Sequence, residues 1–194
     1  MTGTVGGGAH ADARCFLALL PDAATRTLLQ RCRDTLQHAT AGATRGVRWV
    51  EPEALHVTLR FLGASNPAQI EYFKHVLPTL APALPALDGR RYGVWPNRAR
   101  PRLLVLELRA PPALEQLARA CETHASKAGY PAEPHDFRAH VTLARLRPGC
   151  AFGILPGPPR ALTFDALALM RSQLAQPAAT YTELAREPLE TYEP

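Results

Sequence analysis

The sequence lacks the features that would place a protein in or across a membrane. No apolar run reaches the roughly 18 residues that a spanning helix requires. The first 13 residues have neither a basic start nor an apolar stretch of the kind found in signal peptides. We therefore predict no membrane association and a cytoplasmic protein, in which the glycine-rich residues 1–13 form a flexible leader outside the fold.

Disulfide and metal-binding patterns are also missing. The four cysteines are far apart, with no Cys-x-x-Cys pair, and this spacing favours reduced, mostly buried thiols. The sequence contains no His-x-His and no His-Glu-x-x-His pattern, which are common signatures of zinc ligands. We predict no metal site and no cofactor.

Lysine is scarce in a chain that is otherwise basic. Only Lys74 and Lys127 are lysines among the 22 basic residues, which leaves 20 arginines and a formal net charge of +5. The forked donors of arginine suit phosphate groups, so an anionic substrate is compatible with this composition. A general preference for Arg, Ala and Pro along the chain accounts better for most of these arginines.

One four-residue motif, His-Val-Thr-Leu, occurs twice, at residues 56–59 and again at 140–143. In a β-strand, residues i and i+2 lie on the same face. Each copy therefore sends its histidine and threonine to one face and its valine and leucine to the other. This pattern predicts two strands that each have an apolar face on a core and a polar face on a cleft.

The order of predicted elements before each copy of the motif repeats as well. In the first half, an apolar strand over 14–20 is followed by a helix over 22–38 and then by the first copy. In the second half, a strand over 103–108 is followed by a helix that opens at Pro111-Pro112 and stops at Gly129, and then by the second copy. The shared order predicts an internal duplication, in which two similar lobes bring the two copies together across a cleft.

Further segments complete the predicted fold. A helix begins at Asn66-Pro67, and additional strands are predicted over 87–95, 162–170 and 181–185. At 194 residues with 46% hydrophobic content, the chain is long enough to bury one shared core. We predict a single bilobal domain over 14–194.

The paired motif suggests acid and base chemistry. The pKa of histidine lies near neutrality, so two histidines in one cleft can act as general acid and general base at once. Threonine hydroxyls and the guanidinium of Arg145, which follows the second copy, could hold an anionic oxygen. The set matches a phosphodiester, for which one imidazole takes a proton from water and the other protonates the leaving oxygen.

These residues resemble the 2H phosphoesterase superfamily, and within it the bacterial RNA 2′,3′-cyclic phosphodiesterases, also called 2′-5′ RNA ligases. The resemblance runs from Arg14 to about Leu189. It rests on the two His-x-Thr motifs together with Trp49-Val50, Leu55, the run over 56–63, Phe137 and Arg145. The family's fold implies an α+β class, with two antiparallel sheets that form a V-shaped cleft and helices on the outer faces.

The resemblance also implies an activity and a set of site residues. The reaction would be hydrolysis of a terminal 2′,3′-cyclic phosphate of RNA to a 2′-phosphomonoester, by a monomer. By position, His56 would be the proton donor and His140 the proton acceptor. The residues that would bind the substrate are Thr58, Thr142 and Arg145, with Arg60 and Phe137 as further candidates.

Three details of the pattern bear on these assignments. Ala139 stands where the family usually has proline before the second histidine. Arg145 lies five positions after His140, so a bulge or a strand end is needed to place both on one face. Arg60 has the regular spacing from His56 and is therefore the second choice for a phosphate contact. Phe137 fits either stacking on a base or forming a wall of the cleft.

Other functions remain open at this point. The same chemistry could serve reversible 2′-5′ ligation of RNA or a small cyclic nucleotide. A protein of another class, an RNA-binding module without turnover, would not need duplicated histidines. A metallohydrolase would be exposed by sensitivity to a chelator.

Overall fold

The chain is described by a computed structural model, which covers residues 13–39, 46–147, 150, 155–173, 180–190 and 192. The predicted leader, residues 1–13, lies outside these ranges except for Ala13, where the first strand begins. Within them, the strands are β1 (Ala13–Pro21), β2 (Val47–Trp49), β3 (Val57–Ser65), β4 (Gly89–Asn97), β5 (Arg100–Leu108), β6 (His140–Leu146), β7 (Phe164–Gln173) and β8 (Thr180–Pro188). The helices are α1 (Ala23–Ala39), α2 (Pro67–Leu80) and α3 (Pro112–Lys127), and a short 3-10 helix (Pro52–Ala54) precedes β3.

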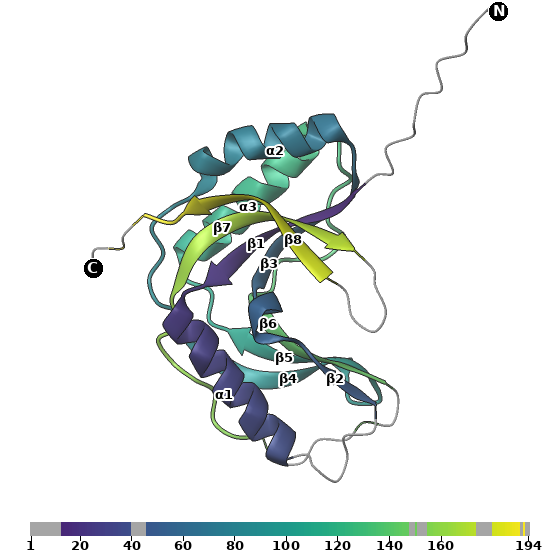
Figure 1. Ribbon diagram of the computed structural model, residues 1–194, viewed down its shortest axis with the longest axis vertical. Coiled ribbons are helices and arrows are strands. Elements are labelled where there is room, and N and C mark those ends of the chain that lie inside the picture. Colours follow the sequence, from purple (N-terminus) through teal and green to yellow (C-terminus); the bar gives the residue numbers. More distant parts are fainter. Residues whose placement is uncertain are drawn as a thin grey trace, which may run out of the picture.

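The strands form one antiparallel sheet that is divided into two lobes. Its order is β4-β5-β6-β3-β1-β7-β8. Strand β2 pairs with β6 on the edge opposite to β5, which is the edge that β3 also joins. A single residue pair, Val57 with Val141, joins β3 to β6, which is why the two expected sheets are connected into one. We call β1, β3, β7 and β8 the first lobe and β2, β4, β5 and β6 the second lobe. Figure 1 shows them diverging from this junction, and the α+β class is confirmed.

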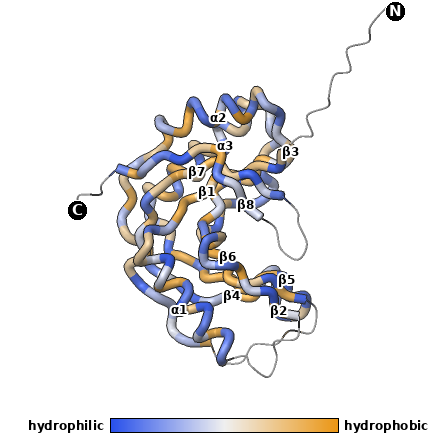
Figure 2. The backbone as a smooth tube through the Cα atoms, viewed as in Figure 1, coloured by the Kyte–Doolittle hydropathy of each residue, from blue (hydrophilic) through white to orange (hydrophobic). Residues whose placement is uncertain are grey.

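The core is built from the apolar strands that the sequence predicts. Leu17 and Leu19 of β1 are fully buried, as are Leu104 and Leu106 of β5 and Leu167 of β7. Burying a side chain of this size stabilises a fold by about 1.5–3 kcal/mol. Figure 2 shows the apolar residues concentrated in these strands, whereas polar and apolar residues alternate along the helices. None of the helices in the described ranges is both long and apolar enough to cross a membrane.

The helices begin and end at the capping residues that the sequence suggests. Asp22 accepts a hydrogen bond from the backbone amide of Thr25 at 2.6 Å, which caps α1. Asn66 and Gln69 exchange two hydrogen bonds at the start of α2, a complete capping box. Gly129 follows α3 with a φ of +84°, the left-handed conformation that ends many helices.

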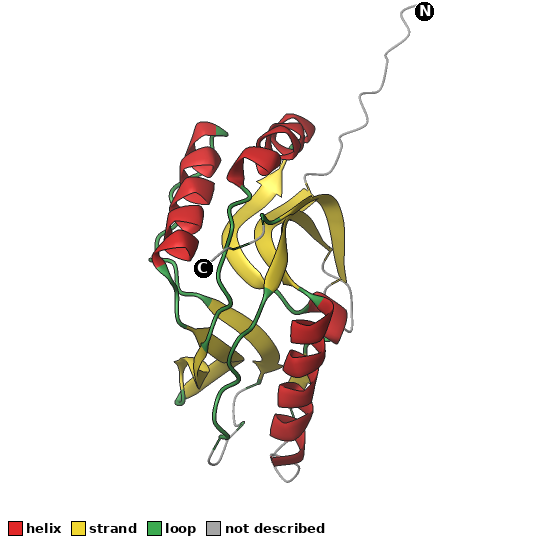
Figure 3. Cartoon of the chain, turned by 90° about the vertical axis from the view of Figure 1, so that its left-hand side faces the viewer, coloured by secondary structure: helices red, strands yellow, loops and turns green. Residues whose placement is uncertain are grey.

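The helices cover the outer faces of the two lobes. Helix α1, from the first half of the sequence, lies on the second lobe, and α3, from the second half, lies on the first lobe. Arg33 of α1 donates to the carbonyl of Val50, which follows β2 in the second lobe, at 2.9 Å. Glu122 of α3 pairs with Arg60 of β3, in the first lobe. Figure 3, seen from the side away from the cleft, shows the helices outside the strands and long connections running between the lobes. Each duplicated half therefore contributes to both lobes.

Candidate active site

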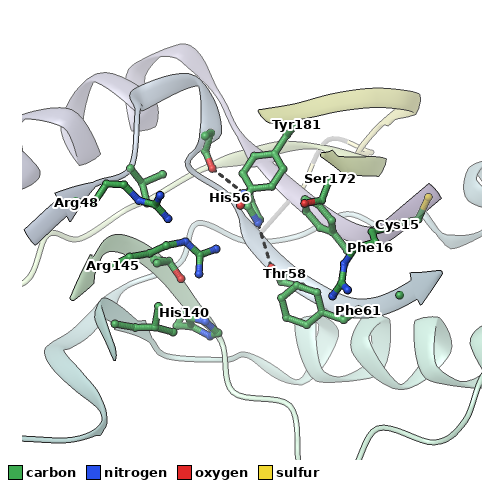
Figure 4. Close-up of a pocket in the computed structure, with 16 residues that line it drawn as sticks. Cys15, Phe16, Arg48, His56, Thr58, Phe61, His140, Arg145, Ser172 and Tyr181 are labelled. Carbon is green, nitrogen blue, oxygen red and sulfur yellow. Dashed lines mark hydrogen bonds between the residues drawn. The ribbon is translucent and has the colours of Figure 1, made fainter. Parts of the chain in front are cut away.

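A cavity of about 660 Å³ lies between the lobes and collects most of the predicted site residues. It is lined by five of them, namely His56, Thr58, His140, Thr142 and Arg145. Figure 4 shows the two histidines facing the same space, one from each lobe, with Arg145 beside them. The sequence prediction that the two motifs meet across a cleft is therefore confirmed.

A β-bulge in β6 brings Arg145 to the cavity. Against β5, Val105 pairs with Thr142 and Leu104 pairs with Ala144, so Leu143 is an extra residue without a partner. The extra residue shifts the alternation of faces by one. Arg145 therefore joins His140 and Thr142 on the cleft face, which confirms that a bulge is needed to place it there.

A matching bulge in β3 changes which residue follows the first motif into the cleft. Against β1, Ala18 pairs with Thr58 and Leu17 pairs with Arg60, so Leu59 is the extra residue. After it, the cleft face is taken by Phe61, whose side chain is 60% exposed and lines the cavity. Phe61 and Arg145 thus hold the same position in the two copies, each five residues after its histidine.

Arg60 is carried away from the cleft by this bulge, and its predicted place beside the phosphate is wrong. Its side chain is only 6% exposed and forms ion pairs with Glu122 and, at 3.2 Å, with Glu133. It also donates to the carbonyl oxygen of Phe61. The prediction assumed regular alternation along β3, which holds only up to Thr58.

His56 is held by its backbone and by aromatic rings. Its Nδ1 lies 2.7 Å from the carbonyl of Ala54, so this nitrogen carries the proton, and its Nε2 lies 3.1 Å from the hydroxyl of Thr58. The rings of Phe16 and Tyr181 lie 5.0 and 5.4 Å from the imidazole, centre to centre. Burial lowers the pKa of His56 to about 4, and the positive charges of His140 and Arg145 act in the same direction.

His140 is held in a similar way but in a different electrostatic setting. Its Nδ1 lies 2.7 Å from the carbonyl of Arg138, and the ring of Trp95 lies 4.5 Å from its own. Burial lowers the pKa of His140, and the charge of the Arg138 guanidinium adds to this effect, whereas the hydrogen bond to the Arg138 carbonyl and the carboxylate of Glu107 oppose it. His140 is therefore the histidine with a compensating negative charge nearby.

Glu107 is a buried carboxylate behind His140, at the centre of a small network of donors. It lies opposite His140 in the β5–β6 pairing and is only 7% exposed. The indole nitrogen of Trp95 and the guanidinium of Arg91 each donate to it at 2.9 Å. Burial alone would raise the pKa of Glu107, but these donors hold the pKa below its ordinary value. Arg138 lies 4.0 Å above the Trp95 ring and completes the stack.

Sequence reasoning missed this network and several walls of the cavity. Glu107 is the only charged residue in an otherwise apolar segment over 103–108, and a buried charge requires partners, so this signal was available. The walls formed by Phe16, Arg48 and Tyr181 left no comparable signal. Phe137, by contrast, is half-buried against the core and is not among the residues that line the cavity.

Metal-ligating side chains do not gather elsewhere in the part of the chain that the structure describes. No group of three or more His, Cys, Asp or Glu residues there is arranged to hold a metal ion. What the cavity does gather is a pair of imidazoles together with threonine hydroxyls and arginine guanidinium groups. Such a set can transfer protons at a phosphate ester and hold its negative charge.

Comparison with known proteins agrees with this chemistry. Residues 19–105 match the model of the family described as LigT like Phosphoesterase. A protein of Methanothermobacter thermautotrophicus named RNA 2′,3′-cyclic phosphodiesterase is 32% identical over 136 residues, covering 69% of this chain and 71% of that protein. A protein of Bacillus subtilis with the same name is 31% identical over 100 residues, covering 50% of this chain and 55% of that protein.

Solved structures show the same architecture over nearly the whole chain. The protein TT0787 of Thermus thermophilus has a TM-score of 0.71 at 25% identity, covering 93% of this chain and 100% of that one. LigT of E. coli, in complex with 3′-AMP, has a TM-score of 0.69 at 26% identity, covering 92% and 98% of the two chains. The chain belongs to the LigT-like phosphoesterase family.

Proposed function

We propose that this protein hydrolyses the 2′,3′-cyclic phosphodiester ends of RNA to 2′-phosphomonoesters, by acid–base catalysis with a pair of histidines. The observation that carries the proposal is the convergence of His56 and His140 on one cavity, each with Nδ1 bonded to a backbone carbonyl. This bond leaves Nε2 of each ring as the nitrogen for proton transfer. The names of the relatives support the choice of RNA as substrate.

In the proposed reaction, one water molecule is consumed and one P–O bond is broken. Nε2 of His140 accepts a proton from water as its oxygen attacks phosphorus. The bond from phosphorus to the 3′ oxygen breaks, and Nε2 of His56 donates a proton to that oxygen. The product carries a 2′-phosphate and a 3′-hydroxyl, and proton exchange with solvent resets the two imidazoles.

Three neighbouring residues would hold the phosphate during this step. The hydroxyls of Thr58 and Thr142 line the same cavity as the histidines, one on each motif. The guanidinium of Arg145 can form two parallel charge-assisted hydrogen bonds with phosphate oxygens. Negative charge grows on these oxygens in the transition state, so donors aimed at them lower the barrier.

The proton on His56 depends on the substrate. With a pKa of about 4, His56 is almost entirely neutral at pH 7 in the free protein. A phosphodiester anion beside the ring favours the charged imidazolium and raises the pKa of His56. Binding of the substrate would therefore prepare the proton donor, because the anion offsets the positive charge of Arg145.

The direct test is an RNA oligonucleotide with a 2′,3′-cyclic phosphate end, incubated with the protein in the presence of EDTA. We expect a 2′-phosphate product, and a decrease in turnover of about 10²–10⁴-fold in His56→Ala and in His140→Ala. His38→Ala is the matched control, because His38 is exposed on α1, away from the cavity. Wild-type activity in either cleft variant, or dependence on metal, would overturn the mechanism.

A second substrate separates the two histidine roles. Bis(4-nitrophenyl) phosphate releases an anion that needs little protonation, so it makes a general acid nearly dispensable. We expect His56→Ala to lose much less activity on this compound than on RNA, whereas His140→Ala loses a similar factor on both. The opposite pattern would exchange the roles of donor and acceptor.

A further inference from the structure

Arg48 and Arg145 form a pair of guanidinium groups at one wall of the catalytic cavity. The two residues are direct partners in the antiparallel pairing of β2 with β6. Side chains of direct partners lie on the same face of a sheet, with Cβ atoms about 5 Å apart. Figure 4 shows both guanidinium groups reaching into the space in front of the histidines. Two positive charges therefore lie side by side at this wall of the cleft.

This pair stands on the boundary between the catalytic cavity and a second hollow of about 330 Å³. Arg48, Arg145 and Tyr181 line both spaces, so the two are continuous at the arginines. Beyond them, the residues that line the second hollow include Trp49, Val50 and Met170. Tyr181 and Met170 give this hollow aromatic and apolar contact beside its basic entrance, which suits a base and a ribose whose phosphate remains at the entrance.

Two carboxylates on the same hollow support this division. Glu51 and Glu53 also line it, and Glu51 lies 3.5 Å from Arg33. Negative side chains disfavour a phosphate inside the hollow and direct it to the arginines. The chemistry of the walls therefore separates a place for a phosphate from a place for the uncharged part of a nucleotide.

We propose that the second hollow holds the nucleotide that precedes the cyclic end of the RNA, and that Arg48 binds the phosphate joining that nucleotide to the terminal one. The proposal rests on the proposed function, since it assumes that the cyclic phosphate lies between the histidines. Arg145 then serves the phosphate that reacts, and Arg48 serves the next phosphate along the strand. The preferred substrate is an oligonucleotide end of at least two nucleotides.

The proposal predicts a measurable preference. A charge-assisted hydrogen bond to phosphate corresponds to about 10–100-fold in kcat/KM. A phosphate contact in a single strand also contributes a slope of about −0.7 to the logarithm of affinity against the logarithm of salt concentration. The kcat/KM of a two-nucleotide substrate should therefore exceed that of the mononucleotide and depend more steeply on salt.

The experiment compares uridylyl-uridine 2′,3′-cyclic phosphate with uridine 2′,3′-cyclic phosphate in three proteins. These are the wild type, Arg48→Gln and Arg119→Gln, a control at an exposed arginine on α3. We expect Arg48→Gln to lose about 10–100-fold more kcat/KM on the dinucleotide than on the mononucleotide, together with the extra salt slope. Arg119→Gln should keep the wild-type ratio between the two substrates.

Several outcomes would overturn the proposal. Equal losses on both substrates would assign Arg48 to the reacting phosphate, and no loss on either would remove it from substrate binding. Equal use of both substrates by the wild type would show that the second hollow is not a subsite. Arg48→Lys is a second variant, which keeps the charge and should keep the salt slope. Failure of the wild type to hydrolyse either compound would instead reject the proposed function.

Discussion

Replacing Arg60 by methionine tests whether this arginine stabilises the fold or binds the substrate. Methionine keeps much of the length and apolar stem of arginine but removes the guanidinium, which is well covered by its surroundings, since only 6% of the side chain is exposed. The variant leaves Glu122 and Glu133 without their shared partner and the carbonyl of Phe61 without its donor. We expect a loss of stability with little change at the cavity.

The size of the loss follows from the burial of the partners. Removing one member of a fully buried ion pair costs about 3–5 kcal/mol, because the remaining charge is uncompensated. Glu122 and Glu133 keep 34% and 36% of their side-chain surface exposed, so water partly replaces the lost partner. We therefore expect the lower end, about 3 kcal/mol, which corresponds to a decrease in Tm of about 6–12 °C for a chain of this length.

The assay combines thermal unfolding, followed by circular dichroism, with kcat/KM on a cyclic-ended RNA at a temperature where the variant is folded. Arg145→Met is the matched comparison, because Arg145 is exposed in the cavity and should show the opposite pattern of preserved Tm and reduced kcat/KM. A variant Arg60→Met with wild-type Tm and a strongly raised KM would refute the reasoning and return Arg60 to the phosphate.

Three further predictions follow from the contacts of single side chains. Glu107→Gln removes the negative charge that raises the pKa of His140, so the limb of the kcat/KM profile against pH that reports His140 should move to lower pH; an unchanged profile would contradict this role. His56 has a pKa of about 4 when folded and 6.5 as its reference value, so between those pH values the unfolded chain binds the extra proton. Stability should then fall on acidification through this window by up to about 3 kcal/mol, and less in His56→Asn, as urea unfolding at several pH values would reveal. Tyr130→Phe removes a buried hydrogen bond to Ser65 of 2.7 Å and should cost about 1 kcal/mol in the same assay without changing kcat.

The parts of the fold that sequence predicts are those set by local patterns. The helix caps at Asp22 and Asn66 and the order of strands and helices around each motif follow from short-range preferences, and the structure contains them. The meeting of His56 and His140 followed from the duplication, because two similar units that share a core place equivalent residues together. These predictions required no knowledge of distant contacts.

What the sequence could not provide depends on strand register. The bulges at Leu59 and Leu143 decide that Phe61 and Arg145 face the cleft and that Arg60 does not, and a bulge is defined by its pairing with another strand. The exchange of α1 and α3 between lobes is likewise a property of the assembled chain. A single acidic residue in an apolar strand, Glu107, indicated a buried carboxylate that needs partners. The sequence did not identify these partners, because Arg91 and Trp95 come from another strand.

The single pair that connects β3 to β6 has a mechanical consequence. Val57 and Val141 are the residues directly after His56 and His140, so both imidazoles lie next to the one pairing between named strands of the two lobes in the described chain; a separate bridge, Leu87 with Leu162, lies outside those strands. If one lobe rotated against the other about this contact, displacement would grow with distance from it. The parts of each lobe far from this contact would therefore move more than the two imidazoles, whose spacing stays nearly constant. Admission of an RNA end and alignment of the acid and base are separate degrees of freedom in this architecture.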